Sequence, residues 1–321
     1  MTFTDEELTK FGIVPGDEWP HAFDPAHEWW NESWFWDWID QSGTRAGHVR
    51  AGWHPNQQRF WLWFFLWNGE EWAAVEEPRL PMTAFPEGTL AYDGWGLTFS
   101  WEAADPLRAG RLRCGGFGRV LSGPRAGFVL PISVDLSVRA LGAPHSPGRR
   151  TDDGYDAGRF EQPVHVSGTG SFAGTELAFD GYGERDHSWG PRDWNMQWLF
   201  VVLHGDDLRL QWARAEVPNV GTFVAGYLHR DVSLRVTDVA DDIVFDHDNV
   251  THPVSGHFTA TAEDGSTVAG TIEPITGTEI DITHAVVPHR PTIYRRALVR
   301  FTPDGGGRPT LGWVEFNRFE R

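Results

Sequence analysis

The segment 181–194 concentrates side chains that can carry out proton chemistry. Its sequence, Gly-Tyr-Gly-Glu-Arg-Asp-His-Ser-Trp-Gly-Pro-Arg-Asp-Trp, mixes carboxyl, guanidinium, imidazole and hydroxyl groups with two tryptophans. Tryptophan is costly to expose, so a solvated charged surface would not use Trp189 and Trp194. The mixture therefore indicates a site where proton donors stand beside an apolar ligand. A structural ion-pair corner is the alternative interpretation.

Asp186 is the predicted proton donor, because burial can keep a carboxylic acid neutral until it protonates an alkene in a dry pocket. Arg185 and Arg192 would instead keep Asp186 ionised. Asp186 would then orient His187, and the imidazolium would be the donor. Neighbouring side chains on a regular strand point to opposite faces, so these two residues act together only if the backbone turns. The predicted catalytic residues are Asp186, His187, Arg192 and Glu184.

Tryptophan is unusually abundant, since the chain has 18 and thirteen of them lie between Trp19 and Trp101. A carbocation within about 6 Å of an indole gains roughly 0.5–2 kcal/mol, so several rings around one pocket would stabilise it. The even-numbered tryptophans of residues 30–38 would share one face of a strand. The alternative is that these rings only close a core. The predicted substrate-binding residues are Trp30, Trp34, Trp36, Trp38, Trp61, Trp63, Tyr182, Trp189 and Trp194.

Composition argues against several classes of function. Lys and Arg number 27 against 45 Asp and Glu, and without a long basic run this net charge of −18 argues against nucleic-acid binding. The single cysteine, Cys114, excludes an internal disulfide and a multi-cysteine metal site. Residues 21–28 contain metal-ligand types, but nearby prolines and the lack of a rigid spacing predict no metal site there. These residues are His21, Asp24, His27 and Glu28.

The sequence also bears on location. An uninterrupted run of about 18 apolar residues is not found, so we expect no integral membrane segment. The first residues, Met-Thr-Phe-Thr-Asp-Glu-Glu-Leu, are acidic and lack the basic-then-apolar order of a signal peptide. We therefore expect a cytoplasmic protein that is a monomer or a weak homodimer.

Strand signals dominate the chain after a short helix predicted over residues 4–10 by a capping box at Thr4 and Glu7. Residues 59–67 are aromatic or aliphatic at both parities, which predicts a strand buried on both faces. The Asn68–Gly69 pair that follows is a strong hairpin signal. Many short strands at regular spacing indicate a sandwich or barrels. The polar stretch 142–160 is the predicted linker, which gives halves 1–145 and 146–321.

The run Gly-x-Arg-Asp-His-Ser-Trp-Gly-x-Arg-x-Trp at 183–194 resembles the tandem-lipocalin superfamily of carotenoid 1,2-hydratases (hydroxyneurosporene synthases) and AttH-like proteins. Lipocalin-like pericyclases that build decalin natural products belong to the same broad group. Softer similarities lie at residues 53–56, 115–118 and 312–316. The resemblance implies an all-β fold of two lipocalin-like (calycin-like) β-barrels in tandem, with the motif near the start of the second. It also implies terpenoid-like or polyketide-like ligands and no metal or organic cofactor.

These observations favour a cofactor-independent enzyme that transfers protons to or from carbon in an apolar unsaturated, terpenoid-like small molecule. Hydration or dehydration, cyclisation and isomerisation all fit, so a hydro-lyase or a terpene cyclase or isomerase is expected. A non-catalytic lipid or terpenoid carrier is the main alternative, although a carrier does not need Asp186, His187 and Arg192 together. A carbohydrate-active protein is the third, because tryptophan walls and carboxylate pairs also suit sugars.

Overall fold

The computed structural model is built almost entirely from β-strands. It describes residues 3–82, 84–85, 89–147, 158–192, 194–217, 221–230, 232–246, 248–250, 252 and 254–319. The chain divides into two compact units, Met1–Arg192 and Asp193–Arg321. The predicted all-β fold with two lipocalin-like halves is confirmed.

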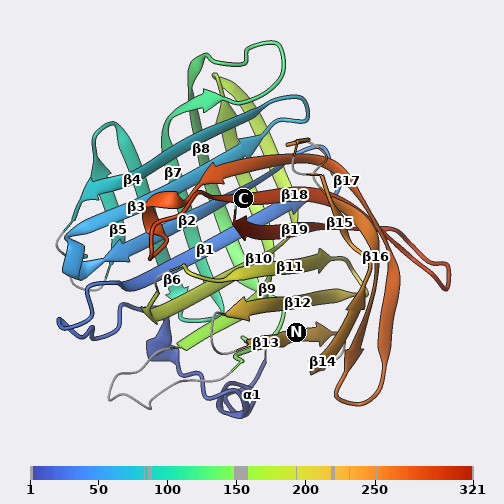
Figure 1. Cartoon of the computed structure of the whole chain (residues 1–321). Helices are drawn as coiled ribbons and strands as arrows, with labels where there is room; N and C mark the ends of the chain where they lie inside the picture. Colours follow the sequence, from blue (N-terminus) through green and yellow to red (C-terminus); the bar gives the residue numbers. More distant parts are fainter. Residues whose placement is uncertain are drawn as a thin grey trace. The chain divides into compact units, whose positions relative to one another are not determined.

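The first unit is a sheet of ten described strands in the order β4-β3-β2-β1-β10-β9-β8-β7-β6-β5. Pairing of β4 with β7 through Ala73 and Val120 closes the strands β1–β4 and β7–β10 into a barrel. Figure 1 shows β1 beside β10, although the two are far apart in the sequence. The strands are β1 (Trp30–Asp40), β2 (Ala46–His54), β3 (Arg59–Trp67), β4 (Trp72–Pro81), β5 (Leu90–Gly94), β6 (Leu97–Asp105), β7 (Ala109–Val120), β8 (Val129–Ala140), β9 (Gly158–Phe172) and β10 (Thr175–Pro191).

The second unit is a sheet of nine described strands in the order β14-β13-β12-β11-β19-β18-β17-β16-β15. A further antiparallel pairing joins β14 to β16 and closes this sheet as well. The strands are β11 (Gln197–His204), β12 (Arg209–Val217), β13 (Gly221–His229), β14 (Ser233–Asp241), β15 (Val244–Phe245), β16 (Val254–Ala262), β17 (Thr267–Asp281), β18 (Thr292–Pro303) and β19 (Thr310–Phe319).

Helices are few and short in the described part of the chain. The predicted N-terminal helix is confirmed as α1 (Asp5–Lys10), with the capping box between Thr4 and Glu7 in place. The other helices are single 3-10 turns, η1 (Pro15–Glu18), η2 (Pro55–Gln57) and η3 (Thr283–Ala285). Within the residues that the structure describes, each helix is too short or too polar to cross a membrane.

The boundary between the units differs from the one expected at residue 145. β9 and β10 extend the first sheet, because β9 pairs with β8 and β10 pairs with both β9 and β1. The 181–194 motif therefore lies mainly on the last strand of the first unit, not near the start of a second one. Residues 148–157 of the predicted linker 142–160 lie outside the described residues, and 158–160 belong to β9.

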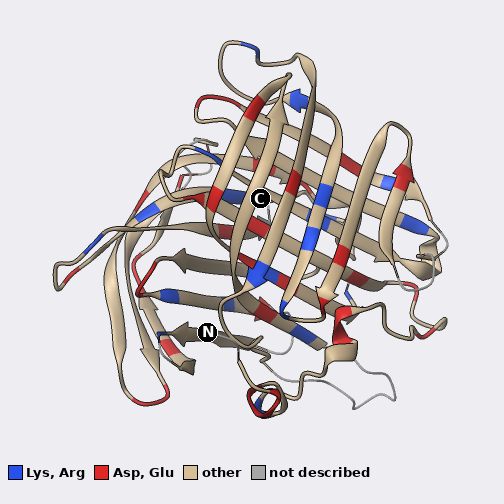
Figure 2. Cartoon of the chain, turned by 180° about the vertical axis from the view of Figure 1, so that it is seen from behind, with Lys and Arg blue, Asp and Glu red and all other residues tan. Residues whose placement is uncertain are grey.

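The interior of the first barrel is packed with aromatic and aliphatic side chains. Trp34, Trp36 and Trp38 of β1 lie in this core with neighbours such as Val49 and Phe60. β3 is buried on both faces, as the sequence predicted. Lys, Arg, Asp and Glu are interspersed along the strands visible in Figure 2. The core thus fixes the registers of β1 and β10, which position the motif.

Glycine is required at position 183, where β10 pairs with β1. A Cβ built there would lie 1.9 Å from the Asp37 carbonyl oxygen. We expect Gly183→Ala to lower the free energy of unfolding by about 1–3 kcal/mol, the usual cost of overpacking. Urea unfolding followed by tryptophan fluorescence measures this loss. Gly16→Ala is the control, since its nearest neighbour would be 3.9 Å away. Equal stability of the two variants would contradict the close approach.

Candidate active site

The side chains of the 181–194 motif are divided between the two faces of β10. β10 is a regular strand here, so neighbouring side chains alternate, and Asp186 and His187 point to opposite faces. Arg185, His187 and Trp189 face the barrel interior, and Glu184, Asp186 and Ser188 face outward. The motif therefore contributes to two separate clusters.

The outer cluster consists of Arg159, Glu161, Glu184 and Asp186 on β9 and β10. Asp186 lies directly opposite Glu161 in the sheet. The Arg159 guanidinium joins the two carboxyl groups, donating to Asp186 Oδ2 at 2.7 Å and to Glu161 Oε1. The Glu161 side chain is 5% exposed, whereas that of Arg159 is 31% exposed. The cluster thus combines a buried carboxyl with a cation that reaches solvent.

Glu161 is the carboxyl group whose protonation is most strongly altered. Burial, the largest cause, raises its pKa, and the nearby charge of Asp186 raises it further. Arg159 and a hydrogen bond with Glu184 act in the opposite direction. The net effect raises the pKa of Glu161 to about 8. This raised pKa favours the protonated form of Glu161 at neutral pH.

Outside the barrel, a row of side chains crosses four strands next to the outer cluster. Asp186 on β10 is opposite Phe35 on β1, Phe35 is opposite Arg50 on β2, and Arg50 is opposite Trp63 on β3. The Arg50 guanidinium lies over the rings of Trp61 and Trp63, 5.1 Å from each centroid. With strands about 4.8 Å apart, the row spans roughly 14 Å. It places a carboxylate at one end and indoles at the other.

The inner cluster consists of Asp17, His21, Glu32 and His187. Glu32 Oε1 lies 2.7 Å from His21 Nδ1 and 2.9 Å from His187 Nε2. Burial lowers the pKa of His21, but hydrogen bonds to Asp17 and Glu32 outweigh it and raise this pKa to about 9. Trp34 stacks on the His187 ring at a centroid distance of 4.5 Å. Asp17 and His21, from the segment before β1, therefore contact His187 and Trp189 of β10.

A buried ion pair anchors this N-terminal segment. Arg185 Nη1 and Nη2 donate to the two carboxylate oxygens of Glu18 at 3.0 and 2.9 Å. The Leu107 N–H and Trp101 Nε1 donate to the same carboxylate at 2.6 and 2.8 Å. Burial alone would raise the pKa of Glu18, but the charge and hydrogen bonds of Arg185 hold it below its usual value. The pair is a structural clamp rather than a free acid.

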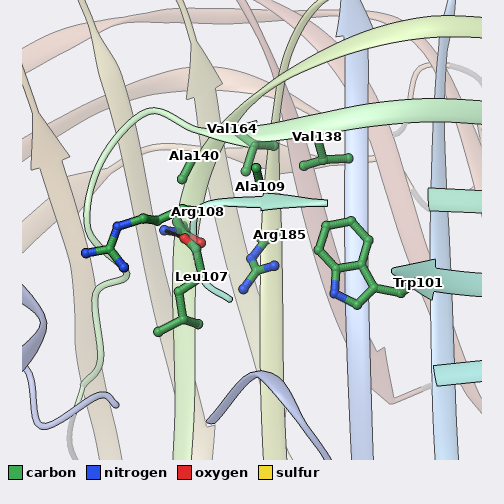
Figure 3. Close-up of a pocket in the computed structure, with 9 residues that line it drawn as sticks. Trp101, Leu107, Arg108, Ala109, Val138, Ala140, Val164 and Arg185 are labelled. Carbon is green, nitrogen blue, oxygen red and sulfur yellow. Dashed lines mark hydrogen bonds between the residues drawn. The ribbon is translucent and has the colours of Figure 1, made fainter. Parts of the chain in front are cut away.

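A small hollow lies beside Arg185 inside the first barrel (Figure 3). Side chains from β6 to β10 line it, including Trp101, Val138, Val164 and Arg185. Its empty volume, which includes open solvent, is about 140 Å³. Ligand pockets usually enclose roughly 300–1,000 Å³, so this hollow is too small for a terpenoid-sized molecule.

The predicted substrate-binding residues fall into several groups. The tryptophans of residues 34–38 belong to the barrel core, and Trp30 and Trp189 pack in a second apolar cluster with Phe160. Both environments are those of packed interiors. The others lie apart: Trp61 and Trp63 are on the outer face, Tyr182 is half-buried on β10, and Trp194 is buried in the second unit.

Arg192 lies just past β10, and its backbone N–H donates to Trp29 O at 2.9 Å.

The sequence interpretation missed Arg159, Glu161 and Glu32, which complete the two clusters. Arg159 and Glu161 alternate with Phe160, a pattern of charge within a strand that signals a functional or paired face. Glu32 lies between tryptophans, where an acid is equally unexpected.

A family model described as a domain of unknown function (DUF7064) matches residues 14–320. No curated protein sequence matches the chain. Solved structures share its fold. CghA with Sch210972 is 15% identical with a TM-score of 0.63, and the match covers 96% of this chain and 93% of that one.

Two further structures extend the comparison. An AttH candidate from Nitrosomonas europaea is 14% identical with a TM-score of 0.51, covering 95% of this chain and 98% of the other. Kievitone hydratase from Nectria haematococca is 12% identical with a TM-score of 0.52, and the match covers 89% of this chain and 88% of the other. These likenesses confirm the predicted resemblance to AttH-like tandem lipocalin proteins at the level of the fold.

Proposed function

We propose that this chain, which belongs to the DUF7064 family, is an enzyme that transfers a proton to carbon in an apolar, unsaturated, terpenoid-like small molecule. The reaction is a hydration, a cyclisation or an isomerisation and uses no organic cofactor. The observation that carries the proposal is the outer cluster, where the buried Glu161 lies opposite Asp186 and burial raises its pKa to about 8. A hydratase among the structures with this fold supports the same class of chemistry.

The outer cluster supports a complete proton cycle. Glu161 gives its proton to one carbon of a C=C bond, and the other carbon becomes cationic while Glu161 becomes a carboxylate. In hydration, water attacks the cation and loses a proton to a carboxylate of the cluster. In cyclisation, a second C=C bond attacks, and a carbon-bound proton returns to the carboxylate. Arg159 bridges Glu161 and Asp186, so it compensates their negative charge in both states.

The row across the sheet supports the choice of an apolar ligand. Phe35 lies next to Asp186, and Trp61 and Trp63 are withdrawn from water. Aromatic faces stabilise a nearby cation by roughly 0.5–2 kcal/mol each and keep the site dry. Arg50, whose Nη2 donates to Asn31 Oδ1 at 3.0 Å, lies over the two indoles at the far end of the row.

Reaction in D2O tests this function directly. The protein is incubated with a panel of isoprenoid alkenes, such as farnesol and geraniol, and products are analysed by mass spectrometry and NMR. We expect a product with deuterium bound to carbon, formed by the wild type and not by a Glu161→Gln/Asp186→Asn double variant. Quenching of tryptophan fluorescence by the same compounds reports binding. Binding without any carbon-bound deuterium would favour a carrier and reject the enzyme.

A further inference from the structure

Three side chains of metal-ligand type converge on one point inside the first barrel. His21 Nδ1 and His187 Nε2 approach the same oxygen, Glu32 Oε1, at 2.7 and 2.9 Å. The ligand atoms of the three residues all lie within 4.8 Å of one another. They come from the segment before β1, from β1 itself and from β10, so only the folded unit assembles them.

Asp17 orients both imidazole rings from behind. His187 Nδ1 donates to the Asp17 backbone oxygen at 2.7 Å, and His21 Nε2 lies 3.2 Å from Asp17 Oδ1. A histidine that binds a metal usually donates its other N–H to a carbonyl or carboxylate oxygen in this way. The nitrogen on the far side of each ring is hydrogen-bonded to Glu32 and would give up its proton when an ion takes the place of that hydrogen.

The cluster is rigid and nearly closed. The side chains of Glu32 and His187 are 0% and 1% exposed, whereas that of His21 is 14% exposed. Trp34 stacks on His187, and Trp189 stacks on His21 at a centroid distance of 3.9 Å. The indoles fix both ring planes, and the partly exposed His21 leaves a path for a small ion.

We propose that His21, Glu32 and His187 bind one divalent transition-metal ion, with Zn2+ the best match to the donor set. Two imidazole nitrogens and one carboxylate oxygen, with a fourth position open, are a common ligand set for zinc. Ligand atoms about 2.0–2.2 Å from a tetrahedral ion are roughly 3.3 Å from each other. The observed 2.7 and 2.9 Å must therefore lengthen by about half an ångström, and the two imidazole nitrogens, which lie within 4.8 Å of each other, must settle near the same spacing. The sequence analysis considered His21 only with Asp24, His27 and Glu28 and expected no metal, so this site is a new proposal.

Cobalt substitution tests the site with a readout independent of activity. The full-length protein is stripped with a chelator, dialysed and titrated with Co2+ or Zn2+. We expect one ion per chain, an intense visible spectrum typical of four-coordinate Co2+, and displacement of Co2+ by Zn2+. Asp17→Asn should weaken binding about 10–100-fold, because it loosens the orientation of His21.

A cysteine at position 187 separates a ligand from a merely structural residue. His187→Cys should keep the ion and add a thiolate-to-cobalt absorption band in the near ultraviolet, while Glu32→Gln should lose the ion. His165→Ala is the matched control, because His165 pairs with Asp180 at 2.9 Å but belongs to no three-ligand cluster among the described residues. Circular dichroism checks that each variant folds.

Three results would overturn the proposal. They are no uptake of Co2+ by the folded wild type, binding of Co2+ by His187→Cys without the thiolate band, and binding of Co2+ by Glu32→Gln as tight as in the wild type. In the first case the three residues form only a hydrogen-bonded network. In the other two the ion lies elsewhere on the chain.

Discussion

Replacing Glu161 by glutamine should reduce turnover by roughly 10²–10⁴-fold, the usual contribution of a general acid. The amide keeps the size of the side chain and can still accept a hydrogen bond from Arg159, but it has no proton to give to carbon. Ligand binding should change much less, because burial of apolar surface drives it. Initial rates on the substrate found in the D2O reaction and titration of tryptophan fluorescence measure the two effects separately.

The same substitution should remove a pH dependence. In the wild type the rate should fall as pH rises through about 8, where Glu161 loses its proton. The free energy of unfolding should also fall as pH rises. The Glu161 carboxyl ionises near its ordinary pKa of about 4.3 in the unfolded chain, whereas it stays protonated in the native state. The free energy of unfolding therefore falls as pH rises from about 4.3 to about 8. Glu161→Gln should flatten both profiles.

Asp186→Asn distinguishes the two carboxyl groups of the outer cluster. Without the charge of Asp186, which helps to raise the pKa of Glu161, that pKa should fall and the decline in rate should move to lower pH. A full loss of activity in Asp186→Asn with wild-type activity in Glu161→Gln would instead make Asp186 the donor, as the sequence first indicated. Wild-type rates in both variants would remove the outer cluster from the reaction.

Much of the fold was predictable because its signals are local. The capping box of α1, the Asn68–Gly69 turn after β3 and the burial of both faces of β3 each depend on residues close in sequence. The boundary between the two units was not predictable from local signals. The polar stretch 142–160 has the composition of a linker, yet its end begins β9, and only pairing with distant strands reveals this.

The candidate site was predictable only in part, for the same physical reason. Alternation indicated that Asp186 and His187 point to opposite faces of a regular strand, and the backbone turn that would bring them together is not found in β10. The partners of these residues come from elsewhere: Arg159 is 27 residues from Asp186, and Glu32 is 155 residues from His187. Tryptophan at 34–38 predicted an aromatic wall, but hydrophobicity alone does not distinguish a packed core from a ligand wall.

Removing the Arg185 guanidinium should destabilise the first unit by about 3–5 kcal/mol, the cost of leaving a buried charge without its partner. In Arg185→Met, Glu18 would keep its hydrogen bonds from Leu107 and Trp101 but would have lost its cation. The loss should shrink at low pH, because protonation of Glu18 then removes the unpaired charge. Urea unfolding at pH 4.5 and pH 7.5 measures both values.

The double variant Glu18→Gln/Arg185→Met decides whether the charge itself is responsible. A glutamine oxygen still accepts a hydrogen bond from Leu107 or Trp101, and no buried charge remains, so most of the lost stability should return at pH 7.5. If the double variant is as unstable as Arg185→Met, the lost packing of the guanidinium over Trp101 and Phe160 is the cause instead. A loss below about 1 kcal/mol in Arg185→Met, as for an exposed pair, would contradict the clamp.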